Sequence, residues 1–144
     1  MKRILFVMLV LAFQGVSAQQ IEVKQAITTF FEGFHNRDTV KMKSVFAKEM
    51  VLHSVAEKKE GAVLSVESAW QLCKSIASIS KEVKFEEKLL SWDIEVDGSM
   101  AHVWTPYEFY INGKLSHTGV NSFQLFKAQD GWKITYCIDT RRAP

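Results

Sequence analysis

Three turn motifs between residues 97 and 131 constrain the fold of this 144-residue chain more than any other feature. They are Asp-Gly at 97–98, Asn-Gly at 112–113 and Asp-Gly at 130–131, at intervals of 15 and 18 residues. Each dipeptide tolerates the positive φ angles of a tight hairpin, and aromatic and β-branched residues flank each one. The pattern predicts a meander of four long antiparallel strands that ends near residue 142.

The first strand of this meander, residues 83–96, changes phase partway. Phe85 and Leu89 stand at odd positions, whereas Leu90 and Trp92 stand at even positions. A one-residue β-bulge near residues 89–90 would reconcile the two phases and bend the strand. Strands of about 12 residues are longer than usual, so we expect this sheet to curl.

The region before the meander predicts helices and one short strand. Apolar residues recur at helical spacing over residues 21–35, and Asp38 is a suitable N-cap for a short helix over about residues 39–46. Residues 50–55 alternate as a short strand. Ser65 is the expected N-cap of a third helix, which starts at Val66.

This order of elements indicates an α+β fold, because the helices are segregated from a sheet that is expected to be antiparallel. A curled sheet must have its concave side filled, and the three N-terminal amphipathic helices are available for this. We therefore expect a half-open, cone-shaped fold of a four-strand meander plus a short strand, with a pocket between sheet and helices.

The first 18 residues have the pattern of a cleaved secretory signal peptide. A basic pair at residues 2–3 precedes an apolar run at 4–13, and the small residues at 16–18 suit a cleavage site. Ten apolar residues are too few to span a bilayer, for which about 20 are needed. We expect an exported protein, periplasmic or secreted, with no stable membrane anchor after cleavage and a single domain over residues 19–144.

Charge and motif content exclude several functions of the mature chain. Removal of residues 1–18 leaves 16 basic and 16 acidic residues, so nucleic-acid binding has no support. The four histidines show no metal-ligand spacing, and the chain has no phosphate-binding glycine loop and no nucleophile elbow. We expect neither a metal nor a cofactor.

The two cysteines, Cys73 and Cys137, leave two interpretations open. An exported protein can form a disulfide between them. Both also lie on apolar patterns, where a free cysteine behaves as a small buried hydrophobic residue.

Four segments of the meander resemble a known family. They are residues 107–110 (YEFY), 116–121 (SHTGVN), 130–134 (DGWKI) and 139–142 (DTRR). They are similar to small exported bacterial members, described as lumazine-binding or SnoaL-like, of the nuclear transport factor 2-like superfamily. The resemblance implies a cone-shaped α+β fold, which hosts carriers, cyclases, dehydratases and isomerases, so it says little about chemistry.

Two positions depart from these relatives. Thr118 stands where they often carry cysteine, and Asn121 stands where they often carry aspartate. An asparagine can form hydrogen bonds but cannot act as a base. The departure therefore argues against a catalytic role carried over from the family.

Hairpin geometry suggests which side chains face the pocket. If residues 112–113 form a two-residue loop, Glu108 pairs with His117 and Trp104 with Asn121, all on one face. A carboxylate facing an imidazole can make a general base. On a solvated face the same pair would be only a weak ion pair.

The register of the last hairpin leaves the position of Asp139 open. A strict two-residue loop at 130–131 places Asn121 opposite Thr140. A three-residue loop flips the parity, so that Asn121 faces Asp139 and Cys137 turns toward the helices. In that case Asp139 reaches the pocket, and a disulfide with Cys73 becomes feasible.

Other side chains are weaker candidates. His53 is more often a hydrogen-bonded core histidine than a catalyst, and Phe34 and Trp70 suit a core or pocket wall. Tyr107 and Tyr110 have opposite parity, so a regular strand turns only one of them inward. The predicted ligand-binding residues are Trp104, Tyr107, Glu108, His117, Asn121, Asp139, His53, Phe34 and Trp70.

Three functions fit these observations. The first is an exported protein that binds a small organic molecule in a partly apolar pocket. The second is a cofactor-independent dehydratase, isomerase or cyclase that uses His117 and Asp139 as acid and base. The third is a non-catalytic homodimeric module that associates through the outer sheet face, where we expect Trp92, Val103 and Val120.

Overall fold

The computed structural model describes the backbone of residues 2–144 and the side chains of residues 18–144. The helices within this range are α1 (Lys2–Asn36), α2 (Thr39–Ser44) and α3 (Ala69–Ser78). The strands are β1 (Phe46–Ala56), β2 (Val63–Ser68), β3 (Phe85–Leu89), β4 (Asp93–Asp97), β5 (Met100–Ile111), β6 (Lys114–Ala128) and β7 (Gly131–Arg141). The side chains of the predicted signal peptide lie outside the described residues up to position 17, so its cleavage stays a prediction.

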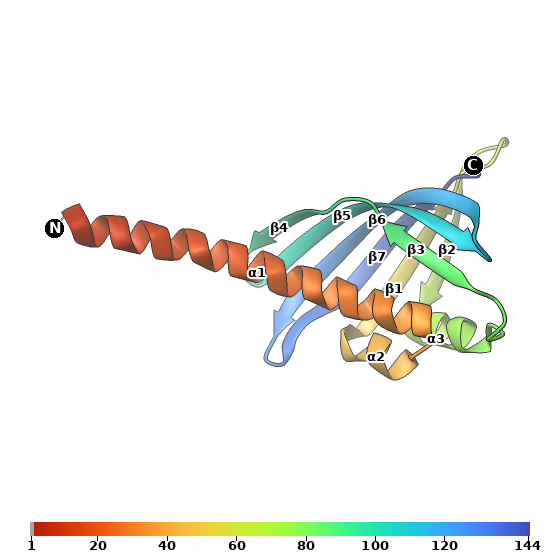
Figure 1. Ribbon diagram of the computed structural model, residues 1–144, viewed down its shortest axis with the longest axis horizontal. Helices are drawn as coiled ribbons and strands as arrows, with labels where there is room; N and C mark the ends of the chain where they lie inside the picture. The colour runs from red at the N-terminus through yellow and green to blue at the C-terminus, as the bar shows by residue number, and fades with distance from the viewer. Residues whose placement is uncertain (1) are drawn as a thin grey trace.

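The seven strands form one curved sheet in the order β2-β1-β7-β6-β5-β3, with β4 also paired to β5. Figure 1 shows this sheet arching over α1, with α2 and α3 beside the C-terminal end of that helix. The predicted α+β cone is confirmed. The sheet is mixed, however, because β1 runs parallel to β7. A long connection separates β1 from β7, so no hairpin imposes an antiparallel direction on this pair.

The predicted phase change divides the first meander strand into β3 and β4, which both pair with β5. Leu89 lies opposite Tyr107, and Asp93 lies opposite Trp104. Four steps along one strand therefore match three along its partner, which is the one-residue excess of a β-bulge. Both strands contact α1.

The predicted start of the third helix at Val66 is wrong. Residues 63–68 form β2, which pairs antiparallel with β1, and the helix begins only at Ala69. Ser68, not Ser65, is the N-cap, and it forms a capping box with Gln71. Alternating Leu64 and Val66 favour a strand, and pairing with β1 satisfies its backbone groups.

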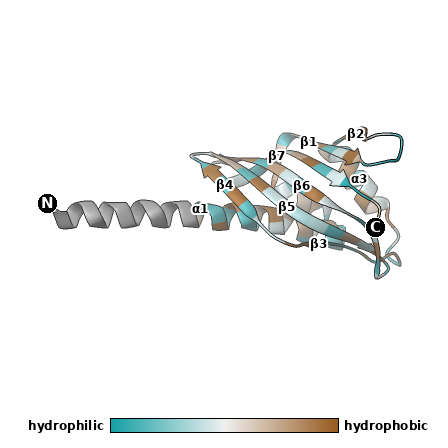
Figure 2. Ribbon diagram, turned by 90° about the horizontal axis from the view of Figure 1, so that it is seen from above, coloured by the Kyte–Doolittle hydropathy of each residue, from teal (hydrophilic) through white to brown (hydrophobic). Residues whose placement is uncertain are grey.

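The apolar face predicted for residues 21–35 lies on α1 and forms the centre of the core. Val23, Ile27, Phe30 and Phe31 are buried against the concave face of the sheet. In Figure 2 the strands carry alternating hydrophobic and hydrophilic segments, as expected for a sheet that buries one face. Among the residues with described side chains, no helix is long enough and apolar enough to cross a membrane.

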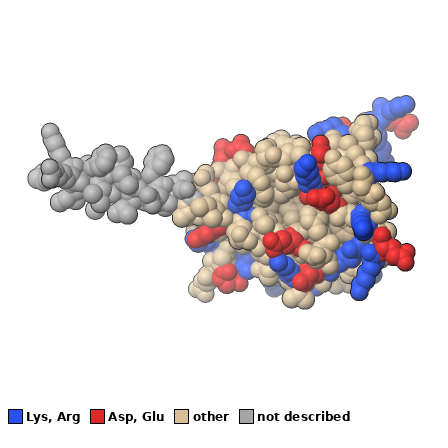
Figure 3. All heavy atoms as spheres, in the orientation of Figure 1, with Lys and Arg blue, Asp and Glu red and all other residues tan. Residues whose placement is uncertain are grey.

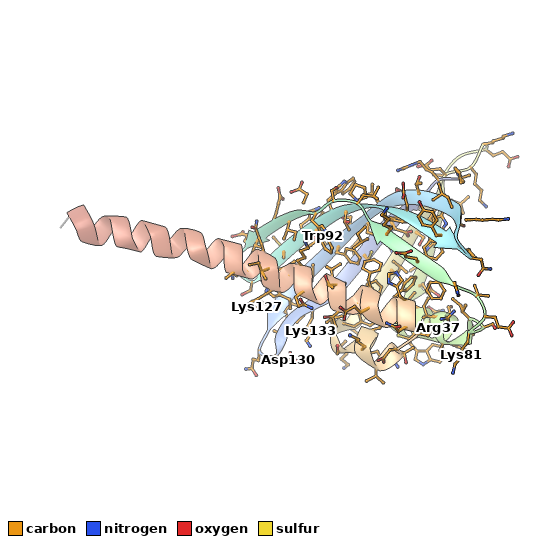
Figure 4. The ribbon with its side chains drawn as sticks, in the orientation of Figure 1. Arg37, Lys81, Trp92, Lys127, Asp130 and Lys133 are labelled. Atoms are coloured by element: carbon orange, nitrogen blue, oxygen red, sulfur yellow. The ribbon has the colours of Figure 1, made fainter. Side chains whose placement is uncertain are left out.

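Arg37 fixes the end of α1 to the segment that leads into β3. Its guanidinium donates to the backbone carbonyls of Ile79, Ser80 and Val83, and it lies 4.8 Å from the ring centroid of Phe85. Figure 4 shows Arg37 at this corner of the molecule. Because β3 is an edge strand, this anchor helps to hold it over the concave side.

Candidate functional site

A cavity of about 380 Å³ lies between α1, α3 and the concave face of the sheet. It is lined by Phe30, Phe31, Phe34, Met50, Leu52, Glu67, Leu72, Ser75, Ile76, Glu87, Phe109, Ile111, His117, Asn121, Phe123, Cys137, Asp139 and Arg141. Aromatic and aliphatic side chains form most of this wall, and the polar residues on β3, β6 and β7 form one end. This combination is typical of a small-molecule site.

Asp139 is the most enclosed charged group of the polar end. The residue is only 5% exposed, and its Oδ2 accepts a hydrogen bond from Arg141 Nε at 2.8 Å. The Tyr107 hydroxyl lies 3.1 Å from the same oxygen and 2.8 Å from the carbonyl oxygen of Thr140. The other oxygen, Asp139 Oδ1, is buried and has no hydrogen-bond partner among the described residues.

Arg141 connects Asp139 to the neighbouring strand. Its Nη2 donates to Ser54 Oγ on β1 at 2.9 Å, while its Nε holds Asp139. Burial alone would lower the pKa of Arg141, but the carboxylate of Asp139 outweighs this and raises the pKa. The guanidinium therefore stays charged and balances Asp139.

Glu87 is the second acid of the polar end. Asn121 Nδ2 donates to Glu87 Oε1 at 2.6 Å. The backbone N–H of Glu87 donates to His35 Nε2 at 2.9 Å. Burial raises the pKa of Glu87 to about 7, and the nearby charge of Asp139 adds to this effect. Asn121 and Arg141 act in the opposite direction. Glu87 can thus gain or lose a proton near neutral pH.

His117 closes the polar end beside the aromatic wall. Its ring stacks on Phe109 with 4.8 Å between centroids and contacts Tyr107 edge-on. Burial, followed by the charge of Arg141, lowers the pKa of His117, so the imidazole is neutral at pH 7. Burial also raises the pKa of Tyr107, which remains a hydroxyl donor.

Two β-bulges decide which polar residues reach the cavity. The two-residue loop at 112–113 pairs Ile111 with Lys114 as predicted, but Ser116 is an extra residue on β6. Beyond it, His117 pairs with Phe109 and Asn121 with Thr105. His117 and Asn121 keep their inward direction, whereas the predicted pairings with Glu108 and Trp104 are wrong.

A second bulge settles the register of the last hairpin. Ala128 pairs with Gly131, so the loop comprises residues 129–130 and matches neither the two-residue loop at 130–131 nor the three-residue loop that was predicted. Thr135 is an extra residue on β7. Asn121 therefore faces Asp139, which was one of the two predicted registers. The parity change comes from the middle of the strand and not from the turn.

Four predicted site residues lie away from the cavity. Trp104 is 48% exposed on the convex face, where Glu108 accepts a hydrogen bond from Tyr110. His53 is on the same face and lies 2.8 Å from the Tyr136 hydroxyl. Trp70 is exposed on α3, where Lys74 lies over its ring. Of the other candidates, Phe34, His117, Asn121 and Asp139 line the cavity, and the buried Tyr107 binds Asp139 beneath it.

Cys73 and Cys137 are both buried as free thiols. Cys137 faces the helices, as the flipped register requires, and lines the cavity. Burial raises the pKa of the Cys137 thiol, so it behaves as an apolar wall residue. The possible disulfide is not present.

Glu87 lines the cavity but was not among the predicted ligand-binding residues. It shares the odd parity of Phe85 and Leu89, which both pack against the core. A carboxylate between two inward apolar positions of a strand is a detectable signal for a polar group in a core. The position of Arg141 beside Asp139 depends on the bulge at Thr135.

The residues expected to form the dimer face do not share a face. Val103 is fully buried on the concave side, and Trp92 packs against the core with Lys24 over its ring (Figure 4). Only Val120 lies on the convex side. Several large apolar residues are exposed there, among them Met100 and Trp104 on β5, Phe126 on β6, and Leu64 and Val66 on β2.

The polar end has the chemistry to orient a ligand and to exchange a proton. Glu87 and Asp139 are acids in different environments, and Arg141, His117 and Tyr107 surround them.

Within residues 18–144, no group of three or more His, Cys, Asp or Glu side chains is arranged to bind a metal ion. On the face drawn in Figure 3, the described positive and negative side chains are interspersed.

Solved structures share this fold at low sequence identity. A "putative dehydratase" of the NTF2-like family from Streptomyces avermitilis is 19% identical, with a TM-score of 0.69 over 89% of this chain and 99% of that chain. An NTF2-like protein with a cystatin-like fold from Novosphingobium aromaticivorans is 10% identical, with a TM-score of 0.72 over 92% and 87%. The beta subunit of a "putative aromatic-ring-hydroxylating dioxygenase" from the same organism is 8% identical, with a TM-score of 0.71 over 89% and 92%.

A search among curated proteins found no match. The sequence of residues 18–136 does match the family described as "Putative lumazine-binding". This range covers most of the chain and includes α3, six of the seven strands in full and much of β7. The chain therefore belongs to this family, whose fold is that of the nuclear transport factor 2-like proteins.

Proposed function

We propose that this protein is an exported binding protein for a small, partly apolar organic molecule. The observation that carries the proposal is the cavity of about 380 Å³, which combines aromatic walls with a buried polar end. Volumes of roughly 300–1,000 Å³ are usual for small-molecule sites. The signal-peptide pattern of residues 1–18 supports export, and the family description supports a heterocyclic ligand.

The first experiment identifies the ligand directly. The full chain is expressed with its own N-terminal segment, purified from the periplasmic or secreted fraction, and analysed by mass spectrometry for a bound compound. We expect a mature N-terminus at Gln19 and a stoichiometric small molecule. Protein that remains in the cytoplasm with residues 1–18 attached would contradict the export proposal.

Calorimetry with lumazine tests binding and its location. Ile76→Trp fills the cavity from α3, so we expect it to weaken binding by at least about tenfold. Thr118→Trp adds the same ring on the convex side of β6 and should leave the affinity unchanged. Equal affinities for both variants would place the ligand outside the cavity.

Glu87 favours a second candidate function, a cofactor-independent dehydratase, isomerase or cyclase in the same cavity. A carboxyl group whose pKa lies near 7 is suited to proton transfer at physiological pH. The structural neighbour described as a dehydratase has the same fold, which is compatible with this chemistry. In this function Glu87 exchanges the proton, while His117 and Asp139 act as the acid–base pair expected from the sequence.

Activity on the co-purified compound separates these roles. Glu87→Gln should remove turnover and keep binding, because glutamine retains the hydrogen bond to Asn121 but cannot transfer a proton. His117→Ala tests the histidine in the same assay. Unchanged turnover in both variants would eliminate the enzymatic candidate and leave the binding function intact.

A further inference from the structure

Resting on the binding function proposed above, we infer that the cavity takes up one proton together with an uncharged ligand, and that Glu87 holds this proton while the ligand is bound. The binding function requires only that a molecule occupies the cavity. The inference goes further, because it makes binding depend on pH and assigns this dependence to one side chain.

Glu87 has no cationic partner in the cavity. Its Oε1 accepts a hydrogen bond from the neutral amide of Asn121 at 2.6 Å, and none of the ion pairs between described residues includes it. Arg141 is the only lysine or arginine among the described residues that line the cavity, and it binds Asp139 and Ser54. A buried carboxylate without a counter-charge depends on solvent for its stability.

The second oxygen of Glu87 is the one that solvent can reach. Oε2 has no hydrogen-bond partner among the described residues, and unlike Asp139 Oδ1 it is not completely buried. Phe85 and Leu89 flank Glu87 on β3, and Phe109 lies opposite it on β5. A ligand that fills the cavity therefore removes solvent from Oε2. An uncharged ligand brings no counter-charge, so the protonated form of Glu87 becomes the stable one.

The free protein is close to this change at neutral pH. Burial raises the pKa of Glu87 to about 7, so at about pH 7.5 most molecules carry the ionised form. Loss of solvent to an uncharged ligand raises this pKa further. The complex then binds more protons than the free protein, so the affinity is highest below pH 7 and falls as the pH rises above it.

The other titratable groups that face Glu87 keep their protonation state above pH 7. Burial lowers the pKa of His35 on α1 and of His117 on β6, so both imidazoles are neutral there. Burial raises the pKa of Tyr107 on β5 and of Cys137 on β7, so both side chains keep their protons. Proton uptake in this range therefore reports on an acid of the cavity.

The charged groups near Glu87 provide a control for this assignment. Asp139 and Arg141 on β7 form an ion pair at 2.8 Å. Glu86 and Lys88, the neighbours of Glu87 on β3, are exposed. Glu67 on β2 lines the cavity from the opposite edge strand of the sheet. It is the second acid outside the ion pair and so the matched control for Glu87.

Calorimetry with 2-naphthalenemethanol, an uncharged probe, measures the proton directly. Binding to the wild-type full chain at about pH 7.5 is compared in buffers of different ionisation enthalpy, and we expect an uptake of roughly 0.5–0.8 proton per ligand. The affinity should fall at least about fivefold between about pH 6.5 and 8.5. The cationic analogue, 2-naphthalenemethylamine, should bind at least about tenfold more weakly than the alcohol at about pH 6.5.

Two carboxyl variants assign the proton. Glu87→Gln mimics the protonated acid and keeps the hydrogen bond to Asn121, so its affinity should change less than about twofold over the same pH range. Its proton uptake should fall below about 0.2 per ligand. Glu67→Gln should retain the wild-type uptake. If Glu87→Gln does not fold, the ¹³C shift of the Glu87 carboxyl carbon, followed with and without the probe, decides the assignment.

The outcomes separate this inference from the binding function. Binding of the alcohol without proton uptake would support a binding cavity and overturn the inference. Binding of the amine as tightly as the alcohol would assign the cavity to cations and also overturn it. An uptake that persists in a folded Glu87→Gln variant would place the proton on another group. No binding of either probe would count against both the cavity as a binding site and its dependence on a proton.

Discussion

On the concave face of the sheet, the Tyr107 hydroxyl lies 3.1 Å from the almost completely buried carboxylate of Asp139. On the convex face, the Tyr136 hydroxyl lies 2.8 Å from the imidazole of His53 at a half-exposed position. Both pairs connect a tyrosine to a titratable side chain across the sheet. The concave pair includes Asp139, which is charged and almost completely buried. Water therefore cannot replace the hydrogen bond from Tyr107 if that bond is lost.

Strand irregularities create this difference between the faces. The extra residues at Ser116 and Thr135 each change the parity of their strand. The bulge at Thr135 turns Cys137, Asp139 and Arg141 inward, whereas a regular β7 would turn their neighbours inward. The two bulge residues, Ser116 and Thr135, lie outside the turns and therefore decide which face of the sheet carries the charged side chains.

Gly119→Ala is the change with the largest expected effect on the concave face. A Cβ at this position would lie 1.8 Å from the carbonyl oxygen of Thr140 and 2.8 Å from Cε1 of Tyr107. Backbone must move to accommodate it, so we expect the free energy of unfolding to fall by about 4 kcal/mol or more. Chemical denaturation measures this. The convex neighbour variant Val120→Ala should cost less than about 1 kcal/mol, and equal losses would show that the faces do not differ in packing.

The pH dependence of stability is the next largest expected difference. The pKa of Glu87 is raised to about 7 in the folded state, from 4.5 in the unfolded chain. The folded state therefore binds more protons between these values, and stability falls as the pH rises through this window. At pH 8 the ionised Glu87 costs up to about 3 kcal/mol, which Glu87→Gln should recover in denaturation experiments.

The difference between wild type and variant isolates this contribution. Burial lowers the pKa of His35 and of His117, so these groups add stability as the pH rises and oppose the effect of Glu87. Their contributions cancel in the comparison. Glu108→Gln makes the same exchange of a carboxyl group for an amide on the convex face and serves as the matched control. A Glu87→Gln profile parallel to that of the wild type would show that Glu87 is not buried as described.

Removal of the two tyrosine hydroxyls tests the comparison directly. Tyr107→Phe leaves Asp139 with Arg141 as its remaining hydrogen-bond partner, so we expect a loss of about 2 kcal/mol. Tyr136→Phe exposes His53 to water, and its loss should be about 1 kcal/mol or less. Denaturant midpoints of both variants provide the measurement. A larger loss for Tyr136→Phe would reverse the assignment of the buried network.

Local signals in the sequence predicted the scaffold well. The dipeptide at 112–113 gives the hairpin that pairs Ile111 with Lys114, and the phase change between Leu89 and Leu90 gives the bulge before β4. Helical spacing predicted the buried face of α1, and Asp38 is the N-cap of α2. These features depend on neighbours in the sequence, so the sequence alone contains the required information.

The candidate site was predicted only in part, because it depends on packing between distant segments. Ser116 and Thr135 carry no residue signature of a bulge, so Trp104 and Glu108 were assigned to the wrong face. The parallel pairing of β1 with β7 places Ser54 beside Asp139, and this arrangement brings Ser54 within reach of Arg141. Only Glu87 could have been found earlier, from its parity with the inward apolar residues of β3.

The smallest expected effect on folding comes from Trp104→Lys on the convex face. Trp104 is 48% exposed, so we expect the free energy of unfolding of the monomer to change by less than about 0.5 kcal/mol. The same substitution tests the predicted homodimer, because Met100, Trp104 and Phe126 are large apolar residues exposed on this face. Light scattering across a concentration series should show a wild-type dimer that the lysine converts to a monomer. A wild type that is monomeric at every concentration would remove the homodimer and leave the concave cavity as the functional surface of the sheet.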